Sequence, residues 1–319
     1  RQGVQVIVTV DCGITAVQEV AFAHERGVQV IVTDHHEPGP ELPCAAAVVH
    51  PRVGSSLFPF PWLSGAGIAF RLAWAIVRRA SSGNRAEARL RDFLVQAVGL
   101  AAIGTVADIV PLLDENRILV HYGCTTSLPQ RPTLGLARLQ SLAAQSRNGK
   151  TNSEWVAFQL APRINAVGRL GQASLAVELL VTEKEDRATE LAAYINSLND
   201  QRRSLEQSIY LRALRQIKEQ WDAENDPAFI LADTDWHQGV IGIVAGRLAE
   251  KFHRPVILIS LSKTGGKLAV GSARSIPGLH LHQALTACAH HLERFGGHAQ
   301  AAGLTIAEKN IVAFRHEFC

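Results

Sequence analysis

Four side chains that suit metal or acid–base chemistry lie at the ends of two apolar segments near the start of the chain: Asp11, Asp34, His35 and His36. The segments Val4 to Val10 and Val28 to Thr33 are rich in β-branched residues, and a helix-like stretch from about Thr15 to Glu25 separates them. This order predicts a strand, a helix and a second parallel strand, each strand covered on both faces. A right-handed crossover brings the carboxyl ends of such strands together, so we expect the four side chains to meet at one sheet edge.

The donor types at this edge indicate which cation they suit. Carboxylates with imidazoles fit Mn²⁺, Mg²⁺ or iron, whereas thiolates would favour zinc. His35 and His36 are neighbours in a segment read as extended, so their rings are expected to face opposite sides and only one of them to ligate a given ion. Two simpler interpretations stay open, since Asp11 also suits a helix N-cap and a His pair also suits a solvated turn.

A third candidate carboxylate interrupts the longest apolar stretch, Phe93 to Leu113. Gln96, Thr105 and Asp108 break this stretch, which favours a buried helix over a membrane span. Burying a carboxylate is costly unless a cation or several hydrogen-bond donors face it. Asp108 is therefore expected either to join the metal site or to be a hydrogen-bonded structural residue.

Composition places the chain among globular proteins with more than one domain. Its 319 residues suffice for two domains, and 47% hydrophobic against 19% charged residues excludes a disordered, fibrous or coiled-coil protein. A formal charge of +3 does not identify a partner. Five cysteines without a CxxC pair indicate neither a disulfide framework nor a zinc knuckle and fit a cytoplasmic protein. The absence of methionine and of a signal peptide before the first strand suggests a fragment of a longer protein.

The remaining pattern predicts an α/β fold: a parallel-sheet domain over residues 1–182, a connector helix over 183–225 and a smaller α/β domain over 226–319. In the first domain we expect a short strand, two helices, a helical stretch broken by prolines and a loop, at Ala45 to Val49, Ser64 to Ala80, Glu87 to Val106, Glu115 to Gln145 and Ala161 to Leu170. The connector is expected to be one long helix, Glu183 to Gln220. In the last domain we expect three strands and two helices, at Ala228 to Ala232, Val256 to Ser260, Lys267 to Ser272, Val240 to Phe252 and Leu281 to Leu292.

Three further groups of residues suit phosphate binding. They are the polar members of the predicted loop, the end of a predicted strand and a glycine-rich turn: Arg163, Asn165 and Arg169; Ser272 and Arg274; Gly296, Gly297 and His298. Arginine forks onto phosphate oxygens, and glycine lets backbone N–H groups approach a ligand. Ordinary solvated turns are the alternative.

Longer motifs resemble a known family. Asp11-Cys12-Gly13, Asp34-His35-His36 and Gly104-Thr-Val-Ala-Asp108 look like three of the four metal-binding motifs of the DHH phosphoesterase superfamily. Four other blocks are similar to the RecJ family of bacterial single-strand-specific 5′ to 3′ exonucleases, with their DHHA1 domain: Pro162 to Arg169, Trp236 to Leu248, Gly271 to Ser275 and Phe295 to Gly303. The resemblance extends over essentially the whole chain.

The resemblance implies two-metal hydrolysis of the 5′-terminal phosphodiester with Mn²⁺ or Mg²⁺. It implies that Asp11 bridges both ions, that His35 and Asp108 hold one of them, that Asp34 orients His35, and that His36 contacts the scissile phosphate. The second phosphate site, with Ser272 and Arg274, would hold the 5′ end of the strand. It further implies a role in DNA repair and recombination, with single-stranded DNA, a single-strand-binding protein and a helicase as partners, in a monomer with no membrane association.

One motif of that family has no counterpart in the sequence. The Asp-x-Asp cluster expected before Asp11 is absent, so we expect this chain alone to bind single-stranded DNA at low salt without degrading it. Within the superfamily, a nano-RNase or cyclic-dinucleotide phosphodiesterase is an alternative, although the Pro162 to Arg169 block and the long connector argue against it. A binding module with a decayed metal site is another. A Rossmann dinucleotide enzyme is disfavoured because no GxGxxG follows the first strand.

Overall fold

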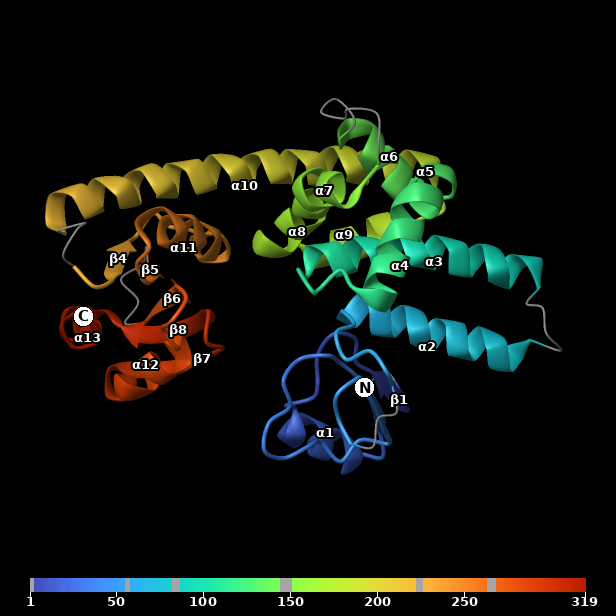
Figure 1. Ribbon diagram of the computed structural model, residues 1–319, viewed down its shortest axis with the longest axis horizontal. Coiled ribbons are helices and arrows are strands. Elements are labelled where there is room, and N and C mark those ends of the chain that lie inside the picture. Colours follow the sequence, from blue (N-terminus) through green and yellow to red (C-terminus); the bar gives the residue numbers. More distant parts are fainter. Residues whose placement is uncertain (1–2, 55–57, 82–86, 144–150, 222–225, 263–267) are drawn as a thin grey trace. The chain divides into compact units, whose positions relative to one another are not determined.

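The computed structural model describes residues 3–54, 58–81, 87–143, 151–221, 226–262 and 268–319 (Figure 1). The chain forms two compact units, with Arg1–Asn165 and Ser174–Asn196 in unit 1 and with Ala166–Ala173 and Ser197–Cys319 in unit 2. The division between the units falls within helices and does not coincide with the domain limits predicted at residues 182 and 225. Those limits stay a prediction. Lys267 and residues 144 and 145, which belong to predicted elements, lie outside the described residues.

Unit 1 begins with a parallel sheet, as predicted, and its strand order is β1-β2-β3. Its strands are Val6–Val8, Gln29–Thr33 and Ala47–Val49, and helix α1, Val17–His24, connects the first two. Val20 of α1 packs with Val30 and Val32 of β2 in a small core. The expectation that both long apolar runs are covered on both faces is wrong for β1, which lies at the sheet edge with all three residues exposed.

The rest of unit 1 is helical. Its helices, three of which extend into unit 2, are α2 Gly65–Ala80, α3 Ala88–Ala107, α4 Asp114–Tyr122, η1 Gly123–Ser127, α5 Leu128–Gln130, α6 Leu134–Ala143, α7 Ser153–Trp155, η3 Val156–Leu160, α8 Ala161–Arg169, α9 Ala173–Val181 and α10 Glu185–Gln220. Among the described helices, α3 is long and apolar enough to cross a membrane by length and composition. It packs against α2 and α4 and buries most of its residues from Val98 to Val106, as predicted for a core helix.

The segment predicted as a loop, Ala161 to Leu170, is instead helix α8, and this prediction is wrong. The prediction relied on the proline, asparagine and glycine of this segment as ordinary turn formers. In the structure a π-helical segment, η3, comes directly before Pro162, and another, η1, comes before Pro129 in α5. A wider π-helical turn leaves room for the proline ring and tolerates its missing N–H, so the helix continues through it.

Unit 2 is built on a five-stranded sheet in the order β4-β5-β6-β8-β7, with only the β4–β5 pair parallel. The strands are β4 Phe229–Asp233, β5 Val256–Ser260, β6 Leu268–Arg274, β7 Leu292–Gly297 and β8 Ala301–Ala307. The helices that follow α10 are α11 Gln238–Phe252, α12 Leu281–Ala287, η4 Ala289–His291, η5 Glu308–Asn310 and α13 Ile311–Phe318. Side chains of α10 and α11 cover one face of the sheet and those of α12 and α13 cover the other, so this sheet has a core on both sides.

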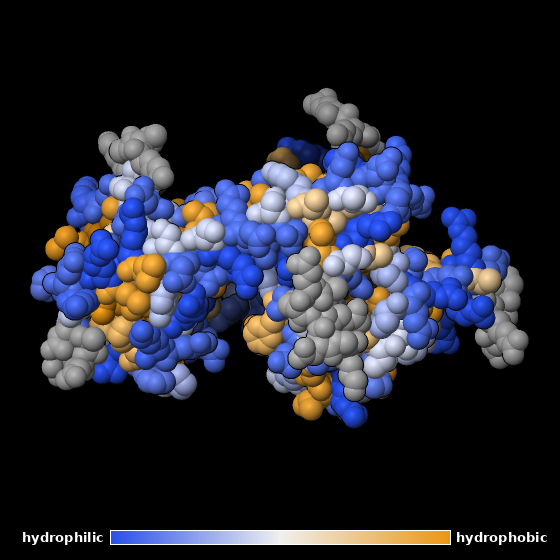
Figure 2. All heavy atoms as spheres, turned by 90° about the horizontal axis from the view of Figure 1, so that it is seen from above, coloured by the Kyte–Doolittle hydropathy of each residue, from blue (hydrophilic) through white to orange (hydrophobic). Residues whose placement is uncertain are grey.

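The last predicted helix, Leu281 to Leu292, ends early, at Ala287. Strands β7 and β8 were not predicted, because Phe295 to Gly303 reads as a glycine-rich turn rather than as two paired strands. On the face shown in Figure 2, hydrophobic residues form small patches among hydrophilic ones.

Candidate functional site

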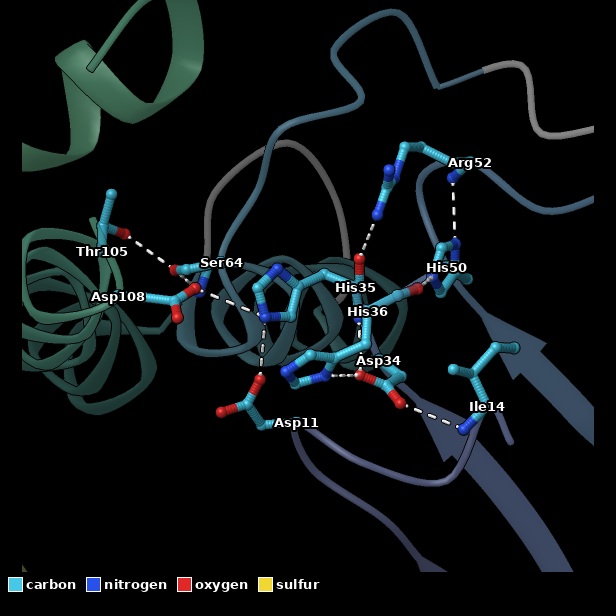
Figure 3. A network of polar contacts seen from close by, with 11 residues as sticks. Asp11, Ile14, Asp34, His35, His36, His50, Arg52, Ser64, Thr105 and Asp108 are labelled. Carbon is cyan, nitrogen blue, oxygen red and sulfur yellow. Dashed lines mark hydrogen bonds and ion pairs between the residues drawn. The ribbon is translucent and has the colours of Figure 1, made fainter. Parts of the chain in front are cut away.

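The imidazole of His35 lies between two carboxylates in unit 1 (Figure 3). Its Nε2 atom is 3.1 Å from Asp11 Oδ1 and 3.3 Å from Asp108 Oδ2, and its side chain is only 13% exposed. Asp11 follows β1, His35 follows β2, and Asp108 ends α3. The predicted convergence of these three residues is therefore confirmed.

Backbone conformation directs Asp11 into this cluster. Its φ is +63°, a left-handed conformation that aspartate tolerates better than most residues, and its N–H donates to the carbonyl of Thr33 at 3.0 Å. Its carboxylate lies close against the start of α2, where a Cβ added to Gly65 would be 2.2 Å from Asp11 Oδ1. Gly65 thus provides the space that the carboxylate occupies. Sequence reasoning missed this residue, although the Ser64-Gly65-Ala66-Gly67 start of a helix was visible.

Asp34 is the hydrogen-bond acceptor that shapes the segment bearing both histidines. It is buried and accepts from the backbone N–H groups of Ile14 at 3.0 Å, His35 at 2.8 Å and His36 at 3.2 Å, and from His36 Nδ1 at 2.7 Å. Burial, the largest single effect, favours the neutral acid, but these hydrogen bonds together hold the pKa of Asp34 below its ordinary value. Asp34 therefore acts on His35 through the main chain and on His36 through the ring.

The rings of His35 and His36 lie side by side, with centroids 4.5 Å apart. The prediction that they face opposite sides is wrong, because the chain leaves β2 at Thr33 and bends at His36 instead of staying extended. One ligand atom from each of Asp11, His35 and His36 lies within 4.8 Å of the others. Both histidines are thus available to one site.

A supporting layer behind the histidines was not predicted. His50 Nε2 donates to the carbonyl of His36 at 2.9 Å, since its Nδ1 accepts from the N–H of Arg52 at 3.0 Å. The guanidinium of Arg52 donates to the carbonyl of His35 at 2.7 Å and to Glu37 at 2.6 Å. Burial lowers the pKa of His50, which keeps this imidazole neutral. The only available signal was the position of these residues just after a short strand.

The electrostatics of the cluster fit a cation. Contact with Asp11 raises the pKa of His35 against the opposing effect of burial, and Asp108 adds to the rise. Burial raises the pKa of Asp108, partly offset by His35. Although two carboxylates are near it, the buried Nε2 of His35 makes no well-oriented hydrogen bond among the described residues. A ring nitrogen that faces two carboxylates without such a bond is the arrangement expected of metal ligands.

Unit 2 contains a polar cavity of about 620 Å³ at the start of α11. Its lining includes three of the predicted phosphate-binding residues and several residues of the α11 start: Arg169, Ser272 and Arg274; His237, Gln238, Gly239 and Gly242. Arg274 Nη1 donates to Ser272 Oγ at 3.2 Å. Burial and the nearby charge of Arg169 lower the pKa of Arg274, so an anion here would relieve both effects. We refer to this cavity as the arginine pocket.

Two glycines of α11 allow the arginine pocket to form. A Cβ on Gly239 would be 2.0 Å from the carbonyl oxygen of Arg169, and a Cβ on Gly242 would be 2.8 Å from Ser272 Oγ. His237 caps the helix by accepting the N–H of Gly239 at its Nδ1, at 3.1 Å. Sequence reasoning singled out none of these three residues, although all of them stand in the Trp236 to Leu248 block.

The other predicted phosphate-binding residues lie elsewhere. Arg163 donates to Asn196 Oδ1 at 2.9 Å and to the carbonyl of Gln159 at 2.5 Å. Asn165 is exposed and lines apolar cavities of unit 1.

The glycine-rich turn has a structural reason for its composition. Gly296 and Gly297 end β7, and the N–H of His298 donates to the carbonyl of Ala301 in the hairpin to β8 at 2.8 Å. At Gly297, with φ +143°, a Cβ would be 2.3 Å from that same carbonyl oxygen. None of these three residues lines the arginine pocket.

Comparisons with known proteins identify the family of the chain. The N-terminal domain of the DHH family matches residues 3–105, and the DHHA1 domain matches residues 225–319. The chain is 43% identical over 315 residues to the single-stranded-DNA-specific exonuclease RecJ of Bacillus subtilis, with 99% of this chain and 38% of that protein covered. It is 39% identical over 307 residues to RecJ of Thermus thermophilus, with coverages of 96% and 42%. The chain thus spans less than half the length of these relatives.

Solved structures give the same relationship. The crystal structure of RecJ from Thermus thermophilus in complex with Mn²⁺ superposes with a TM-score of 0.83 at 36% identity, covering 98% of this chain and 44% of that one. A crystal structure of exonuclease RecJ bound to manganese gives a TM-score of 0.78 at 35% identity, covering 98% of this chain and 74% of that one.

Proposed function

Because this chain belongs to the RecJ family of DHH–DHHA1 proteins, we propose that the longest native form of the protein hydrolyses single-stranded DNA from the 5′ end with divalent metal ions. The observation that supports this most is the approach of Asp11 and Asp108 to the buried Nε2 atom of His35. RecJ relatives are single-strand-specific exonucleases, and RecJ structures contain Mn²⁺ or Mg²⁺.

The donor set fits these ions, since it offers carboxylate oxygens and imidazole nitrogens. Asp11, His35 and Asp108 would hold the metal. When bound, such ions polarise the phosphodiester and lower the pKa of water.

The chain's own residues orient the substrate phosphate. Asp34 accepts a hydrogen bond from Nδ1 of His36 at 2.7 Å, which fixes that tautomer and leaves Nε2 as the ring nitrogen that can reach a ligand or, when protonated, donate to a phosphate oxygen. His50 and Arg52 hold the carbonyl groups of His36 and His35, so both rings stay aimed without support from the substrate.

The 5′ phosphate is assigned to the arginine pocket. Arg274 and Arg169 supply charge, Ser272 supplies a hydroxyl, and the start of α11 adds a favourable helix dipole. This assignment accounts for a 5′-end preference, because only a terminal phosphate would present three oxygens to such a pocket.

The metal-binding capacity of these 319 residues is limited. Three protein donors are too few to hold two ions that each prefer about six ligands, so we expect weak metal binding and little or no cleavage by this chain alone. We place the family function in DNA repair and recombination, in a cytoplasmic monomer that works with a single-strand-binding protein and a helicase. All five cysteines are free, which fits a reducing compartment.

A nucleic-acid-binding module without catalysis is the second candidate, and one observation favours it. Every residue that lines the arginine pocket lies in unit 2, so phosphate binding needs none of the metal ligands.

A strand labelled at either end tests the proposal and separates the two candidates. The purified chain is mixed with 5′-phosphorylated single-stranded DNA in Mn²⁺ at two salt concentrations, and retention and mononucleotide release are both recorded. We expect retention that weakens steeply with salt, as counterion release requires. If the longest native form of the protein also retains the strand and does not cleave it, the result favours the binding module. No retention at low salt would contradict both candidates.

A further inference from the structure

We refer to Asp11, His35, His36 and Asp108 as the metal cluster, after the ions proposed to bind there. A second kind of cavity adjoins it in unit 1. It measures about 460 Å³ and lies between the residues around Asp108 at the end of α3 and the segment from α7 to α8. Most of its lining is apolar, with Asn165, Ser153 and Glu154 as polar members alongside Thr105. None of its lining residues is basic, so its chemistry does not suit a phosphate.

Two large apolar side chains on its wall are left in solvent. Ile109 is 90% exposed and Phe158 is 71% exposed, although both line a cavity that could cover them. Ile109 is the residue directly after the metal-cluster carboxylate Asp108. Exposed apolar groups gathered around a concave site beside reactive groups indicate a ligand surface more than chance exposure.

The backbone at Ile109 supports a functional origin. Its φ of +58° is a left-handed conformation that β-branched residues rarely adopt and that strains the backbone. Glycine or asparagine would adopt this conformation more easily. An isoleucine in this conformation, with its side chain 90% exposed, indicates that the apolar surface itself is used.

Phe158 reaches the cavity from an unusual helical segment. It belongs to the π-helix η3, Val156–Leu160, whose other members Val156 and Leu160 are fully buried. The segment is thus anchored by its neighbours while the phenyl ring faces solvent. Rings held in this way lose little conformational freedom when a flat partner stacks on them.

We propose that this cavity binds a nucleobase of the single strand, stacked on Phe158, covered by the side chain of Ile109 and met at its polar edge by the Asn165 amide. This inference rests on the proposed function, because it assumes that the strand's phosphate lies at the neighbouring metal cluster. It assigns base contacts to unit 1 that are apolar and tolerant of sequence, since every base offers a π face.

The test compares binding of two 5′-phosphorylated strands to the full chain at low salt: an ordinary strand and one with abasic residues at its first three nucleotides. Phe158→Ala is expected to weaken binding of the ordinary strand about tenfold to a hundredfold, the range of one lost stack. On the abasic strand, parent and variant should bind alike. Phe158→Trp should bind the ordinary strand as the parent does.

Matched variants control for structure. Phe22 is also an exposed phenylalanine of unit 1, lies over Arg26 and lines none of these cavities, so Phe22→Ala should leave binding unchanged. Ile109→Gly should keep or raise the melting temperature, because it relieves the strained φ, and yet weaken binding of the ordinary strand. Phe158→Leu, which keeps apolar bulk but no π face, covers the case in which Phe158→Ala fails to fold.

The outcomes separate this inference from the proposed function. A parent that retains no strand overturns both. Two other results overturn the nucleobase site and leave the proposed function standing. In the first, the parent binds and Phe158→Ala and Phe158→Leu bind the ordinary strand as well as the parent does. In the second, these variants lose the same affinity for the ordinary strand and for the abasic strand.

Discussion

The metal cluster of unit 1 and the arginine pocket of unit 2 are opposites in charge. At the first, two carboxylates and two imidazoles face one another, and the pKa values of His35 and Asp108 are both raised. At the second, arginines crowd together and the pKa of Arg274 is lowered. The metal cluster therefore lacks positive charge, which divalent cations would supply. The arginine pocket lacks negative charge, which the phosphates of a DNA strand would supply.

The two sites also differ in what holds them. The metal cluster stands on a three-stranded sheet whose first strand is exposed, and its shape depends on Asp34, His50 and Gly65. The arginine pocket stands on a sheet with a core on both faces. We therefore expect the metal cluster to be the more sensitive to small changes, and the predictions below test that difference.

Loss of a metal ligand is expected to have the largest effect. Asp108→Asn in the longest native form of the protein should lower mononucleotide release from a 5′-phosphorylated strand at least about a thousandfold, because it disrupts the position of both water and phosphate. Asp92→Asn, which alters an exposed carboxylate paired with Arg131, is the matched control. Near-parental turnover by Asp108→Asn would remove this residue from the reaction.

Filling the space beside Asp11 should come next. Gly65→Ala places a methyl group where the Asp11 carboxylate lies, so that side chain must swing away. Since a displacement of about 1 Å at a reacting site can cost about a hundredfold in rate, we expect a loss of that size with a nearly unchanged melting temperature. Gly67→Ala, on the same helix and nearest only to side-chain atoms at 3.3 Å or more, should be milder. Equal effects of the two variants would argue that helix α2, and not Asp11, is affected.

The arginine pocket is tested by Arg274→Ala. Affinity for a 5′-phosphorylated strand should fall by about 1.5–3 kcal/mol, the scale of a charged hydrogen bond, while a 5′-hydroxyl strand should be little affected. Arg294→Ala, an exposed arginine of the same sheet outside the pocket, should reduce both affinities slightly and equally. Equal losses for Arg274→Ala on the two strands would show that the 5′ end is read elsewhere.

The smallest effect concerns pH and His50. Its pKa is lowered in the folded chain, so above the ordinary pKa of about 6.5 both states are neutral and its contribution to stability is complete. As the pH falls below that value the unfolded state binds the proton first, and stability is lost until the pH passes the lowered pKa. Hydrogen exchange of β2 and β3, corrected for intrinsic rates, should therefore accelerate between about pH 7 and pH 5, and less so in His50→Gln. An identical pH response in parent and variant would contradict this role.

The sequence predicted those parts of the molecule that depend on residues close together in the chain. The strand–helix–strand order placed Asp11 and His35 at one sheet edge. Asp108 was singled out as a costly buried carboxylate, but its side chain is 36% exposed in the structure. The parts that depend on long-range contact were not predictable. Gly65 matters only because a side chain distant in sequence packs against it, and His50 only because it meets a carbonyl fourteen residues earlier. Pro162 misled because the π-helical turn that accommodates it has no recognised sequence signal.

The exposed strand β1 has a practical consequence for work in solution. Within the described residues it pairs on one side only, and Val6, Ile7 and Val8 all face solvent, with Val4 and Val10 exposed beside them. An apolar edge without charges or proline is a template for strand pairing between molecules. Such pairing would grow with protein concentration and bury the segment that leads into Asp11. Light scattering across a dilution series should therefore accompany every metal titration, so that self-association is not mistaken for a weak metal site.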